Sequence, residues 1–198
     1  MTPTVIRGRA EVRGRASGML VLGWFGLAWA GWGLSGGFPA AVEVPVLVVA
    51  GLVFAGLIVR AVLMFGQART LPPGDPVAGR AAGRAIGWRF GLIVAAEFAG
   101  LFVIARVLAL TGLIRLIPAI VCLGVGIHFF PLVRLFAVPV YRWTGAALCA
   151  IAVLTVVLAP LLAVPMLWTA LPGFAAALTL DLTAAVLPWS YPAGRTGG

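Results

Sequence analysis

Charged and polar side chains are scarce in this chain of 198 residues. Charged residues make up 10% of it and hydrophobic residues 63%, and the mean hydropathy is +1.14. A soluble domain is closer to half apolar and about a quarter charged. The chain has too little polar surface to cover a core in water. Composition therefore excludes an ordinary soluble domain and predicts that lipid is the solvent for most of the chain.

Lysine and asparagine are absent, so all 14 basic residues are arginines, and the net charge is +9. An excess of arginine can indicate nucleic-acid binding. Here the arginines lie between apolar segments, where the usual causes are membrane orientation and attraction to anionic headgroups. We therefore expect a bilayer with anionic headgroups as the partner and no nucleic acid.

Residues of the kind that bind metals or cofactors are also few. The two cysteines, Cys122 and Cys149, lie inside apolar runs without a CxxC pattern and are interpreted as small buried hydrophobes. A metal site needs three or four ligands, and the chain contains no HxxxH pattern and no phosphate-binding loop. We expect no metal and no cofactor.

The chain is rich in apolar segments of about 20 residues, which is the length of a helix that crosses a bilayer. The sequence predicts an all-α fold, a polytopic transmembrane helix bundle of about six spans. The expected spans are 18–37, 44–65, 90–110, 116–135, 144–163 and 171–188. The residues between 66 and 88 form the longest polar connection, and its arginines favour a short interfacial helix before the third span.

The arginines are distributed unequally between the two ends of these spans. If the N-terminus is cytoplasmic, twelve arginines lie inside and only Arg106 and Arg115 lie outside. This bias predicts that both termini are cytoplasmic. We expect a multi-pass protein of the cell membrane, of the bacterial inner-membrane type. Residues 1–30 could also serve as a cleaved signal because of Ala28-Trp29-Ala30, but an uncleaved signal anchor is the favoured interpretation.

The chain divides into three parts on this basis. Residues 1–17 contain RGRA twice and are expected to form a poorly ordered basic cytoplasmic arm on an anionic membrane face. Residues 18–189 form the six-helix transmembrane domain, and residues 190–198 form a flexible tail.

Three ionisable side chains fall within the expected spans: Glu97, His128 and Asp181. An ionisable group near the middle of a bilayer costs about 3 kcal/mol or more and is a functional candidate for that reason. A carboxylic acid buried in hydrocarbon is expected to keep its proton and to serve as a general acid. His128 would then be the base or the hydrogen-bond partner. Alternatively, each acid only pairs with Arg106, Arg115 or His128 to hold the bundle together.

The stretch that combines these features is Val121–Trp143, which contains the only histidine, followed by Pro131 and Arg134. Pro131 cannot donate a backbone hydrogen bond to Ile127, so we expect a kink beside His128. The run from His128 to Phe136, HFFPLVRLF, resembles a stretch found in small bacterial multi-pass membrane proteins. That resemblance implies several transmembrane helices and implies no activity or site residue.

Three functions are compatible with these residues. The first is an enzyme that acts on a lipid-soluble molecule, with Glu97, Asp181 and His128 as catalytic residues for acid-initiated, terpene cyclase-like chemistry; this is a chemical analogy. The second is a proton-coupled transporter of a hydrophobic molecule. The substrate would be hydrophobic because a single glutamine and three serines provide few side chains to line a path for a polar molecule. The third is a non-catalytic assembly subunit. The sequence favours the handling of a lipid-soluble small molecule.

Overall fold

The computed structural model describes residues 8–72 and 76–190, and only the backbone of residues 76–82. Within these ranges the chain is helical and contains no strand. Six helices are long and apolar enough to cross a membrane, which confirms the predicted fold class and is compatible with an integral, multi-pass membrane protein. The elements are α1 Arg9–Leu34, α2 Ala40–Thr70, α3 Pro76–Leu110, η1 Ile114–Leu116, α4 Ile117–Phe136, α5 Val140–Leu161, α6 Leu167–Val186 and η2 Leu187–Trp189.

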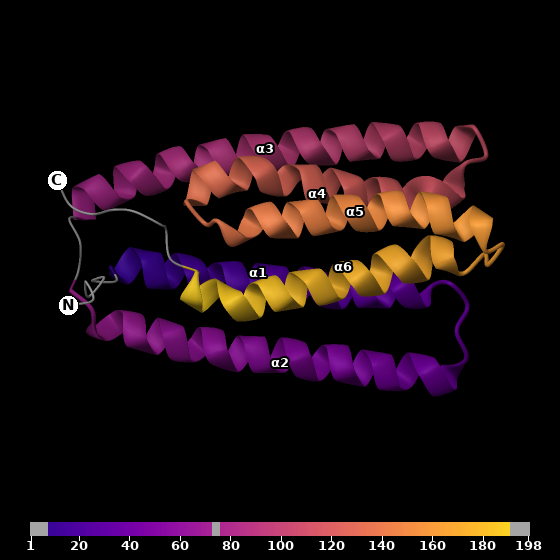
Figure 1. The fold of residues 1–198 in the computed structure, drawn as a ribbon. Coiled ribbons are helices and arrows are strands. Elements are labelled where there is room, and N and C mark those ends of the chain that lie inside the picture. The colour runs from indigo at the N-terminus through magenta and orange to yellow at the C-terminus, as the bar shows by residue number, and fades with distance from the viewer. Residues whose placement is uncertain (1–7, 73–75, 191–198) are drawn as a thin grey trace.

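The helices pack in a spatial order that differs from their order in the sequence (Figure 1). The closest pairs are α1–α6, α4–α5 and α1–α2, followed by α5–α6 and α3–α4. Helices α2 and α3 follow one another in the sequence but lie at opposite edges of the bundle. The core is therefore built mainly from α1, α4, α5 and α6.

Glycines allow the backbones of two helix pairs to approach closely. A Cβ atom at Gly173 of α6 would overlap the backbone of Gly33 in α1. A Cβ atom at Gly126 of α4 would lie 3.0 Å from the carbonyl oxygen of Gly145 in α5. Small residues of this kind drive helix association in lipid, where hydrophobic burial contributes little. The small residues Gly26, Ala30 and Gly33 of α1 are all buried.

The helices extend further toward the basic end of the bundle than expected. Residues 9–17 belong to α1, so this part of the expected arm is helical and not poorly ordered; residues 1–7 lie outside the described residues. Ala, Glu and Arg are good helix formers, and Val12 and Ala16 are buried. The region expected to be an interfacial helix before the third span is likewise part of one continuous helix, α3.

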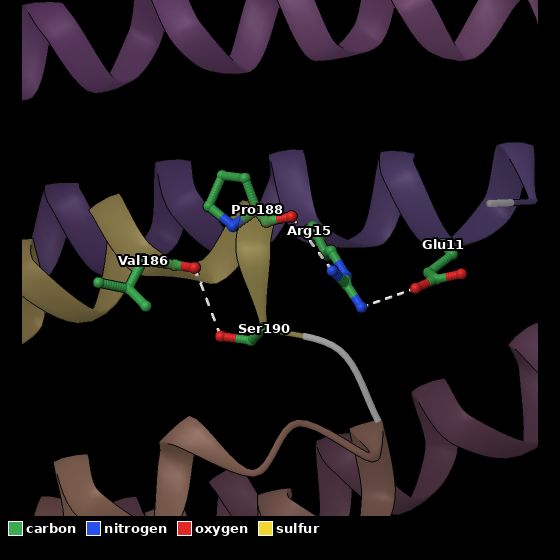
Figure 2. Close-up of polar contacts among 5 residues, drawn as sticks. All are labelled: Glu11, Arg15, Val186, Pro188 and Ser190. Carbon is green, nitrogen blue, oxygen red and sulfur yellow. Dashed lines mark hydrogen bonds and ion pairs between the residues drawn. The ribbon is translucent and has the colours of Figure 1, made fainter. Parts of the chain in front are cut away.

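Arg15 ties the start of α1 to the end of α6 (Figure 2). Its Nη1 donates to the carbonyl oxygen of Pro188 at 3.3 Å, and its Nη2 lies 2.6 Å from Oε1 of Glu11. The side chain is buried. This contact explains why the N-terminal turns of α1 are ordered against the bundle, and it places the start of α1 and the end of α6 at one end.

The two edge helices expose most of their surface. Phe98 and Phe102 of α3 are 61% and 68% exposed, and Leu52 of α2 is 67% exposed. In water such faces would be an aggregation hazard, whereas in a bilayer they are the surface that lipid covers. Helix α3 packs mainly along α4.

Candidate functional site

Glu97 and His128 meet at the interface between α3 and α4. Oε2 of Glu97 lies 2.7 Å from Nδ1 of His128, and the two side chains are 14% and 11% exposed. The short connection between the two helices makes them antiparallel neighbours. Glu97 lies thirteen residues before the end of α3 and His128 eleven residues after the start of α4, so a rise of about 1.5 Å per residue places them at nearly the same depth.

Nδ1 of His128 and Oε2 of Glu97 are at the distance of an ion pair, but their angles are not those of a hydrogen bond. Nδ1 of His128 is buried and makes no hydrogen bond of standard angle, to Glu97 or to any other described residue. Catalytic hydrogen bonds are often poorly aligned before a ligand binds. The pair is therefore close enough to share a proton, and Nε2 remains without a protein partner among the described residues.

Aromatic rings surround the histidine. The ring of Phe90 in α3 lies 6.3 Å from that of His128, and the ring of Phe129 lies 6.0 Å from it, both edge-to-face. Phe129 in turn contacts Tyr141 at 5.4 Å between ring centroids. These rings exclude water and lower the local dielectric, which strengthens the electrostatic interaction within the pair.

Pro131 lies inside α4, one turn after His128, and the helix continues through it to Phe136. The side chain of His128 lies against Glu97.

Asp181 lies elsewhere, between α6 and α1. A Cβ atom at Gly26 of α1 would overlap Oδ1 of Asp181, so the carboxyl group fills the space that this glycine leaves open. Oδ1 is buried and has no hydrogen-bond partner among the described residues. A buried polar atom without a partner is rare in folded proteins and is costly when charged. Asp181 is thus a second, separate candidate.

The structure therefore joins two of the three predicted site residues. Glu97 and His128 form a pair, and Asp181 faces a different helix. The described part of the chain contains no group of three or more His, Cys, Asp or Glu side chains placed to hold one metal ion. The arrangement offers a proton-exchanging pair and an isolated acid.

Sequence reasoning missed two features near these groups. Tyr141 is 7% exposed and packs on Phe129. The guanidinium of Arg60 lies 4.1 Å from the ring centroid of Trp189, and its buried Nε has no hydrogen-bond partner among the described residues. Tyr141 and Phe129 lie on the consecutive helices α5 and α4, whereas Arg60 and Trp189 lie on α2 and η2, a contact for which the sequence carries no local signal.

Two surface cavities lie away from all three ionisable residues. One, of about 610 Å³, is lined by Arg13 of α1 and by Val62, Phe65, Gly66 and Arg69 of α2. The other, of about 200 Å³, is wholly apolar and lies between α4 and α5. Cys122 is buried in that helix interface, where Sγ donates to the carbonyl oxygen of Leu148 at 3.4 Å, in keeping with a small buried hydrophobe.

Comparisons of the chain with protein-family models, with curated proteins and with solved structures find no match.

Proposed function

We propose that this protein binds a lipid-soluble small molecule from the bilayer and couples its passage to proton exchange at the Glu97–His128 pair. The observation that supports this most strongly is the distance of 2.7 Å between Nδ1 and Oε2. Carboxylate and imidazole groups in contact within a membrane are the elements of proton relays in pumps and transporters. The two side chains are close enough for a proton to pass between them.

The position of the pair supports a hydrophobic ligand. It lies between an edge helix and the core, and the surrounding surface of α3 is apolar and exposed. A molecule dissolved in the bilayer can reach this surface laterally without crossing a polar path. Phe90, which is partly exposed beside the histidine, provides an aromatic ring for contact with such a molecule.

A structural role has support of its own. Glu97–His128 is the ion pair that links α3 to α4 in the described residues, and α3 packs on little else. In that case the pair would hold α3 in place. Glu97→Gln separates the two roles because glutamine keeps the size and a hydrogen-bonding oxygen but cannot exchange a proton.

An acid-initiated enzyme is the second candidate function, and Asp181 is the residue that favours it. Among the described residues, its buried Oδ1 has no hydrogen-bond partner. The carboxyl group could therefore donate its proton to a substrate as a general acid. Such an enzyme would use Asp181 alone, because Glu97 is engaged with His128. Trp29 and Trp32 of α1 stack with ring centroids 5.1 Å apart, and the partly exposed ring of Trp32 offers an aromatic face that stabilises a cation.

The experiment is a mass-spectrometric comparison of cells that make wild type, Glu97→Gln, Asp181→Asn or Glu43→Gln at equal membrane levels. Lipophilic compounds are measured separately in the cells and in the medium. Glu43→Gln is the control because Glu43 lies in the first turn of α2 and not at the candidate site. The cells are supplied with isoprenoid precursors.

Transport predicts a compound whose total amount is constant but whose distribution between cells and medium depends on Glu97. An enzyme predicts a compound whose total amount depends on Asp181. If Glu97→Gln and Asp181→Asn both match wild type in amount and distribution, both proposals fail and the pair is structural.

A further inference from the structure

The cavity between the first turns of α1 and the last turns of α2 is lined by two arginines and by apolar residues. Arg13 and Arg69 supply the charge, and Val62, Phe65 and Gly66 form the apolar part of the lining, called the floor below, in a volume of about 610 Å³. Val62 and Arg69 are seven residues apart on α2, which corresponds to about 10 Å along the helix axis. The cavity therefore runs from charge to hydrocarbon along the direction of the spans.

The two guanidinium groups have no acidic partner among the described residues. The nearby carboxylate, Glu11, is engaged by Arg15 at 2.6 Å, and the only other ion pair of the described residues is Glu97–His128. Within the described residues, these two exposed arginines on neighbouring helices face no carboxylate, so an anion that binds between them is favoured.

Arg9 fixes the shape of this cavity. Its Nη2 donates to the carbonyl oxygen of Leu71 at 2.7 Å, and its Nε donates to the same oxygen at 3.1 Å. Nη2 also donates to the carbonyl oxygen of Arg69 at 3.2 Å. These bonds hold the start of α1 on the end of α2, so the backbone positions of Arg13 and Arg69 keep their spacing before any ligand binds.

We propose that this cavity binds one anionic phospholipid, with its phosphate between Arg13 and Arg69 and an acyl chain against Val62 and Phe65. The apolar floor is what a lipid uses and a free phosphate ion does not. The open space at Gly66, where a Cβ atom would contact nothing within 4 Å, gives room for the chain. This inference does not rest on the proposed function of the Glu97–His128 pair.

The test is native mass spectrometry of the full chain in a non-ionic detergent. Phosphatidylglycerol, phosphatidylcholine with the same acyl chains and inorganic phosphate are each titrated in turn. We expect one saturable phosphatidylglycerol, bound about tenfold more tightly than phosphatidylcholine, since each arginine near an anionic group contributes roughly one power of ten or less.

The variants isolate the two halves of the site. Arg13→Gln/Arg69→Gln is expected to lose the preference for phosphatidylglycerol. The control Arg84→Gln/Arg89→Gln removes the same charge from exposed positions on α3 and is expected to keep it. Gly66→Leu keeps both arginines and places a side chain in the floor of the cavity, so it is expected to weaken phosphatidylglycerol binding. It should not destabilise α2, because leucine has a higher helix propensity than glycine.

Three results would overturn the proposal. Equal losses in the two double variants would indicate diffuse charge attraction. Inorganic phosphate that binds as tightly as phosphatidylglycerol would indicate a free-anion site. Unchanged binding in Gly66→Leu would show that the acyl chain does not occupy the cavity.

Discussion

At the scale of single residues, the contact between Glu97 and His128 is the feature on which the functional argument depends. Two groups that are each costly in hydrocarbon offset part of that cost when they lie 2.7 Å apart. Removal of one partner leaves the other buried and unpaired. The energetics of the pair are therefore expected to be strongly non-additive.

A double-mutant cycle tests this coupling. Glu97→Ala and His128→Ala are each expected to lower the free energy of unfolding by about 1–3 kcal/mol, and the double variant by less than the sum. The measurement is reversible unfolding in mixed micelles. The matched pair Glu43→Ala and Arg106→Ala, which form no ion pair with each other, should be additive. Additive effects at Glu97 and His128 would contradict the contact.

Gly26 provides a second test at this scale, because its missing side chain makes room for Asp181. Gly26→Ala is expected to destabilise the protein by about 1–3 kcal/mol through overpacking. Gly31→Ala, on the same helix with nothing within 4 Å of its Cβ position, should be neutral or stabilising. Adding Asp181→Ala to Gly26→Ala should restore part of the loss, as thermal unfolding would show. If Asp181→Ala restores no stability to Gly26→Ala, Asp181 does not lie against Gly26.

At the scale of elements, the two close helix pairs, α1–α6 and α4–α5, hold the core, and their glycines are the cause. Gly173→Ala pushes a methyl group into the backbone of α1 at Gly33. We expect it to lower the unfolding temperature more than Gly26→Ala does, because a backbone cannot move aside as a carboxyl group can. Gly100→Ala on α3, which faces open space, is the control. Equal unfolding temperatures for Gly173→Ala and Gly100→Ala would rule out this close approach.

The helices and their number could be predicted from the sequence because 20-residue apolar runs have few alternatives in a bilayer. The sequence also contains enough information to predict the Glu97–His128 contact. The turn at 111–115 makes the third and fourth spans antiparallel neighbours and places the two residues at the same depth. The position of Asp181 could not be predicted, because no pattern in the sequence shows that the sixth helix packs on the first. The helical extension of α1 into the basic arm was missed because Arg15 finds its partner, Pro188, 173 residues away.

At the scale of the whole molecule, the uneven distribution of arginines predicts which end is cytoplasmic. Thr70 and Thr111 are a matched pair for testing it: both are exposed, lie at the C-terminal ends of helices and bond a carbonyl oxygen three or four residues back. In a background with Cys122→Ala and Cys149→Ala, a membrane-impermeant thiol reagent should label Thr111→Cys in intact cells and Thr70→Cys only after lysis. The reverse pattern would invert the topology.

The measurement that tests the central claim most directly is proton flux in proteoliposomes, followed by an entrapped pH dye after addition of a lipid extract from the producing cells. We expect wild type and Glu43→Gln to carry a flux that protein-free vesicles lack. Glu97→Gln and His128→Gln should reduce that flux about a hundredfold, since a positioned acid–base group contributes about that much or more. A flux retained in Glu97→Gln, or a wild-type flux equal to that of empty vesicles, would contradict the account.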